Sequence, residues 1–187
     1  GYGLSVVGCI HDAITGNYLL TKELVLSREE AIDLLFSCGV TDVSSLPHKG
    51  KIDGKEVFSV LLPTDFNFLG KDRSNNEVKI VNGQLKSGFM DKANLGQESG
   101  LMLRNIYELY GPARTADTLG KISKLGIAVL SRRGFSIGLG DLDLQDETNQ
   151  QIKETISGAE QEAFKLIDNY YAGKLDPLPG RSLKETL

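Results

Sequence analysis

The stretch "VKIVNGQLKSGF", Val78–Phe89, contains the clearest β signal in the chain. Its apolar residues alternate with polar or outward-facing ones as far as Ile80, and Leu85 resumes the alternation after a break. In that break, Asn82 and Gly83 form a pair that readily adopts the two positive φ values of a tight hairpin turn. The sequence therefore predicts a β-hairpin with one buried face.

Two helices are predicted before this hairpin, each from a capping box. In "LSREEAIDLLFSCG", Ser27 caps the helix and Glu30 follows three residues later. "DGKEVFSVLLP" repeats the pattern with Asp53 as the cap, Glu56 three residues on and Pro63 as the breaker. The residues expected on the buried faces are Ala31, Leu34, Leu35, Val57, Phe58, Leu61 and Leu62.

From Gln97 onward the chain is predicted to be mainly helical. Gly111 and Pro112 end one helix and start the next, because glycine suits the position after a helix and proline the first turn. A long helix is expected from about Gln150 to Tyr171. Residues at helical spacing are Met102, Ile106, Leu109, Ala116, Leu119, Ile122, Leu125 and Val129, then Ile152, Ile156, Ala159, Ala163, Phe164, Ile167 and Tyr170. The predicted fold class is α+β, a small mixed β-hairpin or sheet domain with several helices followed by a long helix.

Composition limits the functions that need considering. The chain has 187 residues with 40% hydrophobic and 25% charged, enough for one ordinary domain or two small ones. Its net charge is −4, whereas a free-standing nucleic-acid-binding protein usually carries an excess of positive charge. Any contact of this chain with nucleic acid is therefore expected to be local. No apolar run approaches the ~20 residues of a membrane span. Cys9 and Cys38 lack CxxC spacing and are expected to be buried reduced thiols, with a single disulfide as the alternative.

Three glycines make "GFSIGLGD", Gly134–Asp141, resemble a phosphate-binding loop. Gly138 and Gly140 supply GxG, but the third position of a dinucleotide fingerprint holds Asp143. The expected structure is a tight turn between two helices, in which glycine permits positive φ. The following "DLDLQDE" lacks the central glycine and terminal glutamate of a calcium loop, so no metal site is predicted.

Two further features leave a choice of interpretations. His11 and His48 lie near no credible nucleophile, and core or capping roles are expected for both. Residues 111–134 are mainly basic, whereas residues 141–163 are mainly acidic. The two charged segments are either neighbouring helices, or the acidic one is a partner-binding face.

Several segments occur in an order that resembles a known family. They are "GCIHDAITGNYLLT", "GKEVFSVLLP", "VNGQLKSGFMDKANLG", "LMLRNIYELYGP" and "RRGFSIGLGD". From about Gly8 to its end, the chain resembles the largest subunit of multisubunit DNA-directed RNA polymerases of archaeal and eukaryotic type. The resemblance implies a pore domain at 1–141 and a funnel domain at 142–187. The funnel would consist of the acidic helix and the start of a second helix at Ser182, where Glu185 completes a capping box.

The resemblance also implies a function. Pore and funnel would form the wall of the secondary channel, through which nucleoside triphosphates enter and a backtracked RNA 3′ end extrudes. Other polymerase subunits and a transcript-cleavage factor at the funnel rim are the implied partners, with DNA, RNA and NTPs bound only in the assembled enzyme. The family's Mg²⁺-binding carboxylates belong to an upstream Asp-Phe-Asp-Gly-Asp motif that this sequence lacks, so it carries no catalytic residue or cofactor of its own. The location implied is the cytoplasm of an archaeon or the nucleus of a eukaryote.

Site residues follow from the same resemblance. Lys92 is the leading candidate for contact with triphosphate or RNA, and Lys86 the second, a solvated turn lysine being the alternative. Relatives often carry another lysine where this chain has Ala93. The residues of the expected structural joint between pore and funnel are Gly134, Gly138, Gly140 and Asp141. Two competing hypotheses remain, a stand-alone helical interaction module with an acidic face and an independent nucleotide-binding enzyme that uses the glycine loop.

Overall fold

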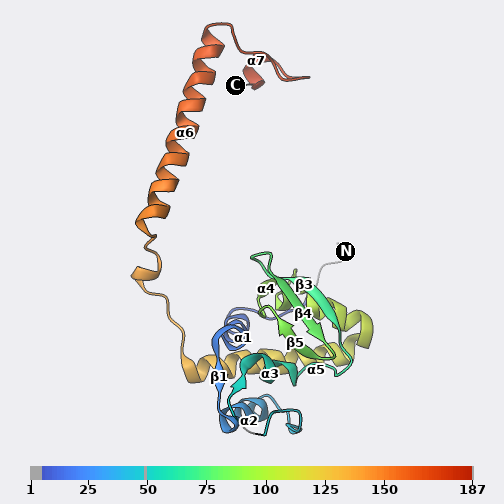
Figure 1. Cartoon of the computed structure of the whole chain (residues 1–187). Coiled ribbons are helices and arrows are strands. Elements are labelled where there is room, and N and C mark those ends of the chain that lie inside the picture. Colours follow the sequence, from blue (N-terminus) through green and yellow to red (C-terminus); the bar gives the residue numbers. More distant parts are fainter. Residues whose placement is uncertain (1–5, 49, 187) are drawn as a thin grey trace. The chain divides into compact units, whose positions relative to one another are not determined.

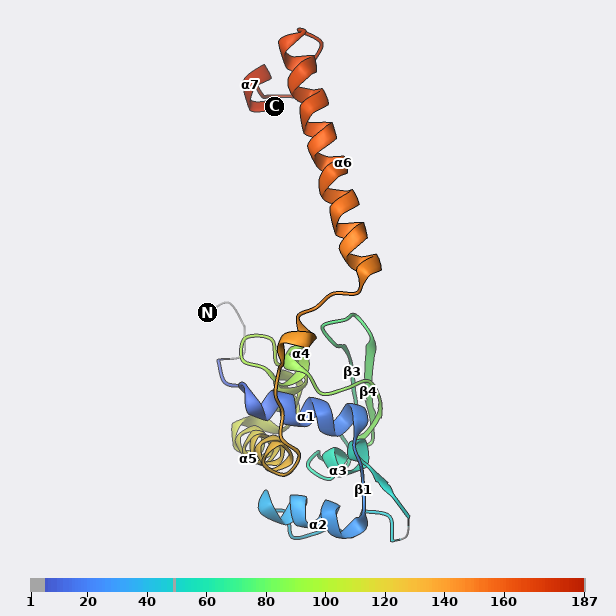
Figure 2. The same ribbon diagram turned by 90° about the vertical axis from the view of Figure 1, so that its left-hand side faces the viewer.

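The computed structural model describes residues 6–48 and 50–186, and the chain divides into two compact units (Figures 1 and 2). The first unit is Gly1–Phe135 and the second is Ser136–Leu187. Helices and small antiparallel sheets occur together, so the predicted mixed α and β class is confirmed.

The early helices of the first unit are α1, Asp12–Glu23, α2, Arg28–Ser37, and α3, Gly54–Ser59. Two of the three, α2 and α3, begin where the capping boxes predict, whereas α1 was not predicted. At α2, the Ser27 amide donates to Glu30 Oε2 at 2.8 Å, and the Glu30 amide donates to Ser27 Oγ at 3.2 Å. Asp53 and Glu56 form the equivalent pair at α3. All seven apolar residues predicted for the inner faces are buried, although Leu61 and Leu62 follow the end of α3 rather than lying on it.

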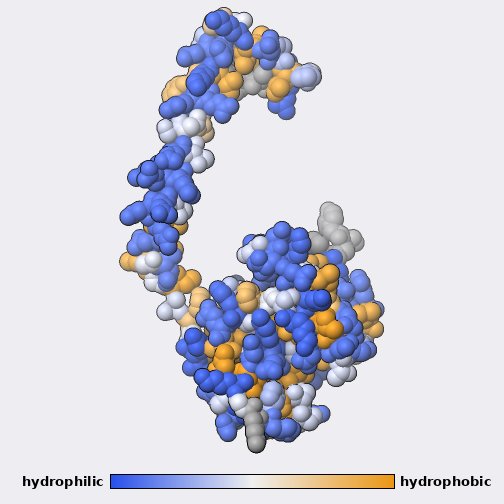
Figure 3. Space-filling model, viewed as in Figure 1, coloured by the Kyte–Doolittle hydropathy of each residue, from blue (hydrophilic) through white to orange (hydrophobic). Residues whose placement is uncertain are grey.

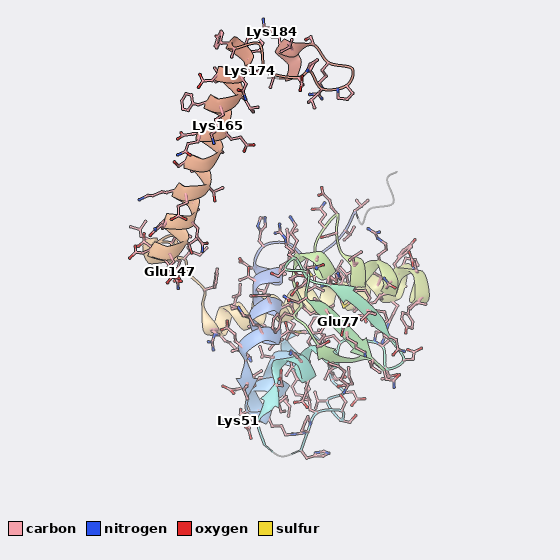
Figure 4. The ribbon with its side chains drawn as sticks, turned by 45° about the horizontal axis from the view of Figure 1, so that its top comes forward. Lys51, Glu77, Glu147, Lys165, Lys174 and Lys184 are labelled. Atoms are coloured by element: carbon pink, nitrogen blue, oxygen red, sulfur yellow. The ribbon has the colours of Figure 1, made fainter. Side chains whose placement is uncertain are left out.

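The strands form two sheets. The first sheet pairs β1, Val25–Leu26, with β2, Ile52–Asp53. The second is antiparallel and has three strands in the order β3, Phe68–Lys71, β4, Glu77–Val81, and β5, Gln84–Ser87. The β4–β5 hairpin is confirmed, with φ of 49° at Asn82 and 70° at Gly83, and Ile80 opposite Leu85. Strands β1, β2 and β3 were not predicted. The side chains of Glu77 and Lys51 are exposed on this unit (Figure 4).

Helix α5, Leu101–Arg133, is the central helix of the first unit. It packs against α1, α2, α4 (Lys92–Leu95) and β3, and Figure 2 shows it almost end-on between α1 and α2. Gly111, with φ 76° and ψ 177°, interrupts the helical backbone just before Pro112, so the predicted break is confirmed. Leu109 and Ala116, which lie on either side of this break, are exposed rather than buried.

Helices α1 and α5 cross at close range. A Cβ on Gly16 would overlap the Gly126 carbonyl oxygen and lie 2.5 Å from its carbonyl carbon. Beside this contact, buried Asn17 donates from Nδ2 to the carbonyl oxygens of Ala13 at 2.7 Å and Ile122 at 2.9 Å. The two backbones touch because neither helix has a side chain at the crossing.

The buried apolar residues of the first unit form one core. Its largest fully buried side chains include Phe58, Phe66, Leu20, Leu35, Met90 and Met102. Both thiols, Cys9 and Cys38, are buried and free, so the predicted reduced state is confirmed. The first unit therefore has the apolar interior that independent folding requires.

The second unit consists of a short 3₁₀ turn, Leu139–Asp141, the long helix α6, Asp146–Tyr171, and α7, Leu183–Thr186. The predicted long helix is confirmed, but none of its residues is buried within its unit. Mostly hydrophilic side chains cover its visible surface, and Glu147 and Lys165 project into solvent (Figures 3 and 4). Across the described parts of the chain, no helix combines the length and apolar character needed to cross a bilayer.

Candidate functional site

Helix α4 presents Lys92, and the buried carboxylate of Asp91 fixes where this helix begins. Asp91 Oδ1 accepts from the backbone amides of Ala93 at 3.0 Å and Asn94 at 3.3 Å. Asn94 and Leu95 are buried against the core, whereas Lys92 is exposed. The exposed lysine is thereby held on a short, anchored helix.

The β3–β4 turn brings Arg73 to the same carboxylate. The backbone amide of Arg73 donates to Asp91 Oδ2 at 2.8 Å. Within the turn, the Asn76 amide donates to Asp72 Oδ1 at 2.8 Å, and Lys71 Nζ donates to Asn75 Oδ1 at 2.8 Å. One buried carboxylate therefore ties the turn that carries Arg73 to the helix that carries Lys92.

The segment before α1 completes the arrangement. Cys9 donates its backbone amide to the Leu95 carbonyl at 2.7 Å and forms an isolated parallel bridge with Gly96. A Cβ on Gly8 would lie 2.6 Å from the carbonyl oxygen of Gly96, so this close approach depends on glycine. His11, with φ 41°, is the N-cap residue of α1.

A pocket of about 480 Å³ lies where these segments meet. The residues that line it are Cys9, Ile10, His11, Ile14, Thr15, Arg73, Lys92, Gln97 and Glu98. Its charged lining comprises two fixed cations, Arg73 and Lys92, and one carboxylate, Glu98, with the His11 imidazole as a further polar group. A cationic surplus on an anchored frame is suited to an anion.

Neither cation is neutralised by a close partner. Within the described residues, the ion pairs within 4.0 Å are Lys22–Glu23 and Lys121–Asp117. The charges of Arg73 and Lys92 are therefore available to a ligand.

The buried thiol of Cys9 does not add a nucleophile to this pocket. Cys9 as a whole residue is 2% exposed, and its Sγ lies 3.4 Å from Ser123 Oγ. Burial raises the pKa of the Cys9 thiol, an effect that the hydrogen bond with Ser123 offsets only in part. The thiol is therefore protonated near neutral pH, and thiolate chemistry is not expected.

The structure brings one of the two predicted lysines to the pocket. Lys86 lies exposed on β5 and does not line it. The sequence analysis missed Arg73, although the turn-rich segment "KDRSNN" between two strands contains it.

The core or capping roles expected for the two histidine side chains were wrong. His48 is exposed, and His11 is exposed and makes no side-chain capping hydrogen bond.

A second pocket, of about 680 Å³, adjoins the break in α5. Its lining is largely apolar and includes Val7, Leu103 and Leu119. Its charged members, Arg104 and Glu108, have opposite signs. This pocket has no cationic surplus, which distinguishes it from the pocket that Lys92 lines.

The glycine-rich segment forms a turn after a helix. Gly134 ends α5 with φ 74°, and its amide donates to the Leu130 carbonyl at 2.8 Å. Asp141 Oδ2 accepts from the Gly138 amide at 2.7 Å and closes the 3₁₀ turn. Positive φ is thus confirmed at Gly134 but not at Gly138 or Gly140, because the 3₁₀ turn uses ordinary negative φ values.

The acidic stretch lies on the long helix of the second unit. Asp146 and Glu147 occupy the first turn of α6, where negative charge interacts favourably with the helix dipole. Glu154, Glu160 and Glu162 follow along the same exposed helix. The two interpretations of the charge distribution, neighbouring helices or a partner-binding face, stay open.

Comparison with known proteins adds independent information. The family described as RNA polymerase Rpb1, domain 3, matches residues 2–142. The chain is 34% identical to DNA-directed RNA polymerase subunit Rpo1N of Thermococcus celer, over 100% of this chain and 25% of that subunit. It is 35% identical to Rpo1N of Methanothermobacter thermautotrophicus, over 100% of this chain and 23% of the relative. The chain therefore spans a quarter or less of the length of these relatives.

Proposed function

Because this chain belongs to the RNA polymerase Rpb1 domain 3 family, we propose that it forms part of the secondary-channel wall of a DNA-directed RNA polymerase. In this role it lines the route by which nucleoside triphosphates enter and a backtracked RNA 3′ end leaves. One observation carries the proposal: exposed Lys92 projects from an anchored helix into a pocket with a cationic surplus. Triphosphates and RNA are polyanions, and an unpaired ammonium attracts them as a point charge.

The proposed domain assignment is a pore domain at 1–141 and a funnel domain at 142–187. The family match ends at residue 142, next to that boundary, whereas the first compact unit ends at Phe135 and the second begins at Ser136. The glycine-rich turn of residues 134–141 spans the interval between these positions. We therefore propose that this turn is the joint between pore and funnel.

The proposed partner of the funnel part is a transcript-cleavage factor. Support comes from α6, whose acidic residues are exposed along its length. Such a helix would attract a basic surface on the partner. Other polymerase subunits would cover further parts of the chain, and the catalytic Mg²⁺ would be bound by carboxylates of an upstream segment.

The decisive experiment replaces Lys92 with alanine in an assembled archaeal polymerase. Two quantities are measured: the NTP concentration for half-maximal elongation rate, and the rate of factor-stimulated cleavage of backtracked RNA. Loss of one exposed charge contact should change at least one of them by about two- to fivefold. The matched control is Lys79→Ala, because Lys79 is an exposed lysine on β4 that does not line the pocket. Unchanged elongation and cleavage in Lys92→Ala would refute the channel role.

The same assays evaluate Lys86. Its position on β5, outside the pocket, favours an effect no larger than that of the Lys79 control. A larger effect than that of Lys92→Ala would move the proposed contact from α4 to the outer face of the sheet.

A further inference from the structure

We propose that Arg73 is a second ligand of the anion in this pocket, so that Arg73 and Lys92 together hold one phosphate group. The inference rests on the proposed function for the biological source of the phosphate, and on the geometry of the pocket for the site itself. Arg73 lies in the β3–β4 turn and Lys92 on α4, so no local sequence pattern pairs them.

The chemistry of the two side chains is complementary. A guanidinium presents parallel N–H donors that match two oxygens of one phosphate, whereas an ammonium acts as a compact point charge. Both Arg73 and Lys92 line the same pocket, and neither has a carboxylate within 4.0 Å among the described residues. Glu98 is the acidic member of the lining, so the lining itself keeps a positive surplus. The Asp91 carboxylate does not line the pocket, and its oxygens accept hydrogen bonds from backbone amides.

The backbone segments that carry the two cations are held in place before a ligand arrives. The Asp91 side chain is 9% exposed, with Oδ2 bound to the Arg73 amide and Oδ1 bound to the amides that begin α4. The Lys92 carbonyl is also held, by the Ser99 hydroxyl at 2.5 Å and the Gly96 amide at 2.9 Å. Because both backbones are anchored, the ligand orders two side chains rather than two loops, which lowers the entropic cost of binding. Asp91 is accordingly a positioning residue for both cations.

The size and setting of the pocket agree with a phosphate rather than a larger apolar ligand. About 480 Å³ accommodates a phosphate with part of the molecule that carries it. His11, Thr15 and Gln97 add polar groups around the two cations. The shared chemistry is a phosphate monoanion or dianion, from either the triphosphate of a nucleotide or the phosphodiester backbone of RNA.

The test titrates the ¹⁵N-labelled chain with two probes, because the first unit has its own core. Inorganic tripolyphosphate represents the nucleotide source, and an RNA trimer without terminal phosphates represents the phosphodiester source. Chemical shifts of the amides near Arg73, Lys92 and Gln97 should move with at least one probe. The probe that binds more tightly identifies the source.

Variants decide the role of Arg73. Arg73→Ala should weaken binding by about tenfold or more, as expected for loss of a charge-assisted hydrogen bond. Arg73→Lys should recover part of this loss, and Lys79→Ala should leave affinity unchanged. Spectra of Arg73→Ala that match the parent away from the pocket would exclude misfolding. Unchanged affinity in Arg73→Ala, or shifts clustered away from these residues, would overturn the inference.

Failure of this inference can be distinguished from failure of the proposed function. If Lys92→Ala impairs the assembled polymerase while Arg73→Ala alters neither phosphate binding nor polymerase activity, the channel role stands and the two-cation site is wrong. If phosphate binding requires Arg73 but neither variant alters elongation or RNA cleavage, the site stands and the channel role is wrong.

Discussion

Replacing Gly16 with alanine should destabilise the first unit severely. The added Cβ would lie 2.5 Å from the carbonyl carbon and 2.8 Å from the Cα of Gly126. Carbon atoms in contact are normally about 3.5–4.0 Å apart, so the helix backbones must separate by roughly 1 Å. Both partners are backbone atoms, and no side-chain rotation relieves the overlap.

Two contributions determine the magnitude. Overpacking costs about 1–3 kcal/mol. Separating the helices also breaks the buried hydrogen bond from Asn17 Nδ2 to the Ile122 carbonyl, now 2.9 Å, and an unsatisfied buried group costs about 1–3 kcal/mol. The expected loss of about 2–6 kcal/mol is a large part of the ~5–15 kcal/mol that stabilises a typical domain.

The assay is urea unfolding followed by far-UV circular dichroism. A loss of this size should lower the unfolding midpoint by about 1 M urea or more. Gly120→Ala is the matched control, because Gly120 lies in α5 and a Cβ there meets nothing within 4 Å. Alanine in a helix interior is favoured over glycine by about 0.5–1 kcal/mol, so this control should be more stable than the parent. Equal midpoints for the two variants would refute the argument that the α1–α5 crossing requires glycine.

Other substitutions examine different contributions. Gly111→Ala should cost about 1–3 kcal/mol in the same urea assay, although a Cβ there meets nothing within 4 Å, because φ 76° and ψ 177° suit glycine alone; no loss would contradict this strain. Asp53→Ala should cost about 1 kcal/mol by removing the α3 cap, as measured by thermal unfolding. Hydrogen bonds from the backbone amide and hydroxyl of Ser27 lower the pKa of the Glu30 carboxyl in the folded state. The ionised Glu30 therefore contributes fully to stability above its unfolded-state pKa, and this contribution disappears as pH falls through the lower folded-state pKa. Urea unfolding between pH 3 and pH 6 should therefore show a smaller pH dependence in Glu30→Gln, and an unchanged slope would contradict that assignment.

Local signals in the sequence predict the elements that carry a helix cap, a turn pair or a long apolar period, but they miss α1, α4 and the strands β1, β2 and β3. Capping boxes locate the starts of α2 and α3, and Asn82 with Gly83 locates the hairpin, because these features depend on neighbours within a few residues. Strand β3 was missed since its sequence, "FLGK", is short and contains a glycine. Helix α6 was predicted from its apolar spacing, yet Ile156 and Phe164 are 54% and 66% exposed. Periodicity shows which face is apolar, but not what covers it.

The candidate site could be predicted only in part. The resemblance pointed to Lys92, whereas Arg73 meets it through Asp91, a contact between residues 18 positions apart that no spacing rule encodes. The approach of Gly8 to Gly96 joins segments still more distant in sequence. Propensity describes each segment separately, and the pocket arises from how three segments pack together.

The crossing of α1 and α5 also determines when this protein can fold during its synthesis. Asn17 and the Ile122 carbonyl that it binds are 105 positions apart. At a translation rate of about 5–20 residues per second, α1 waits roughly 5–20 s for its partner helix to be made. Throughout that interval the face of α1 that is buried in the folded protein, which includes Leu20, is not yet packed against α5. The nascent chain is therefore most exposed to aggregation before α5 leaves the ribosome, and conditions that slow translation would prolong that interval.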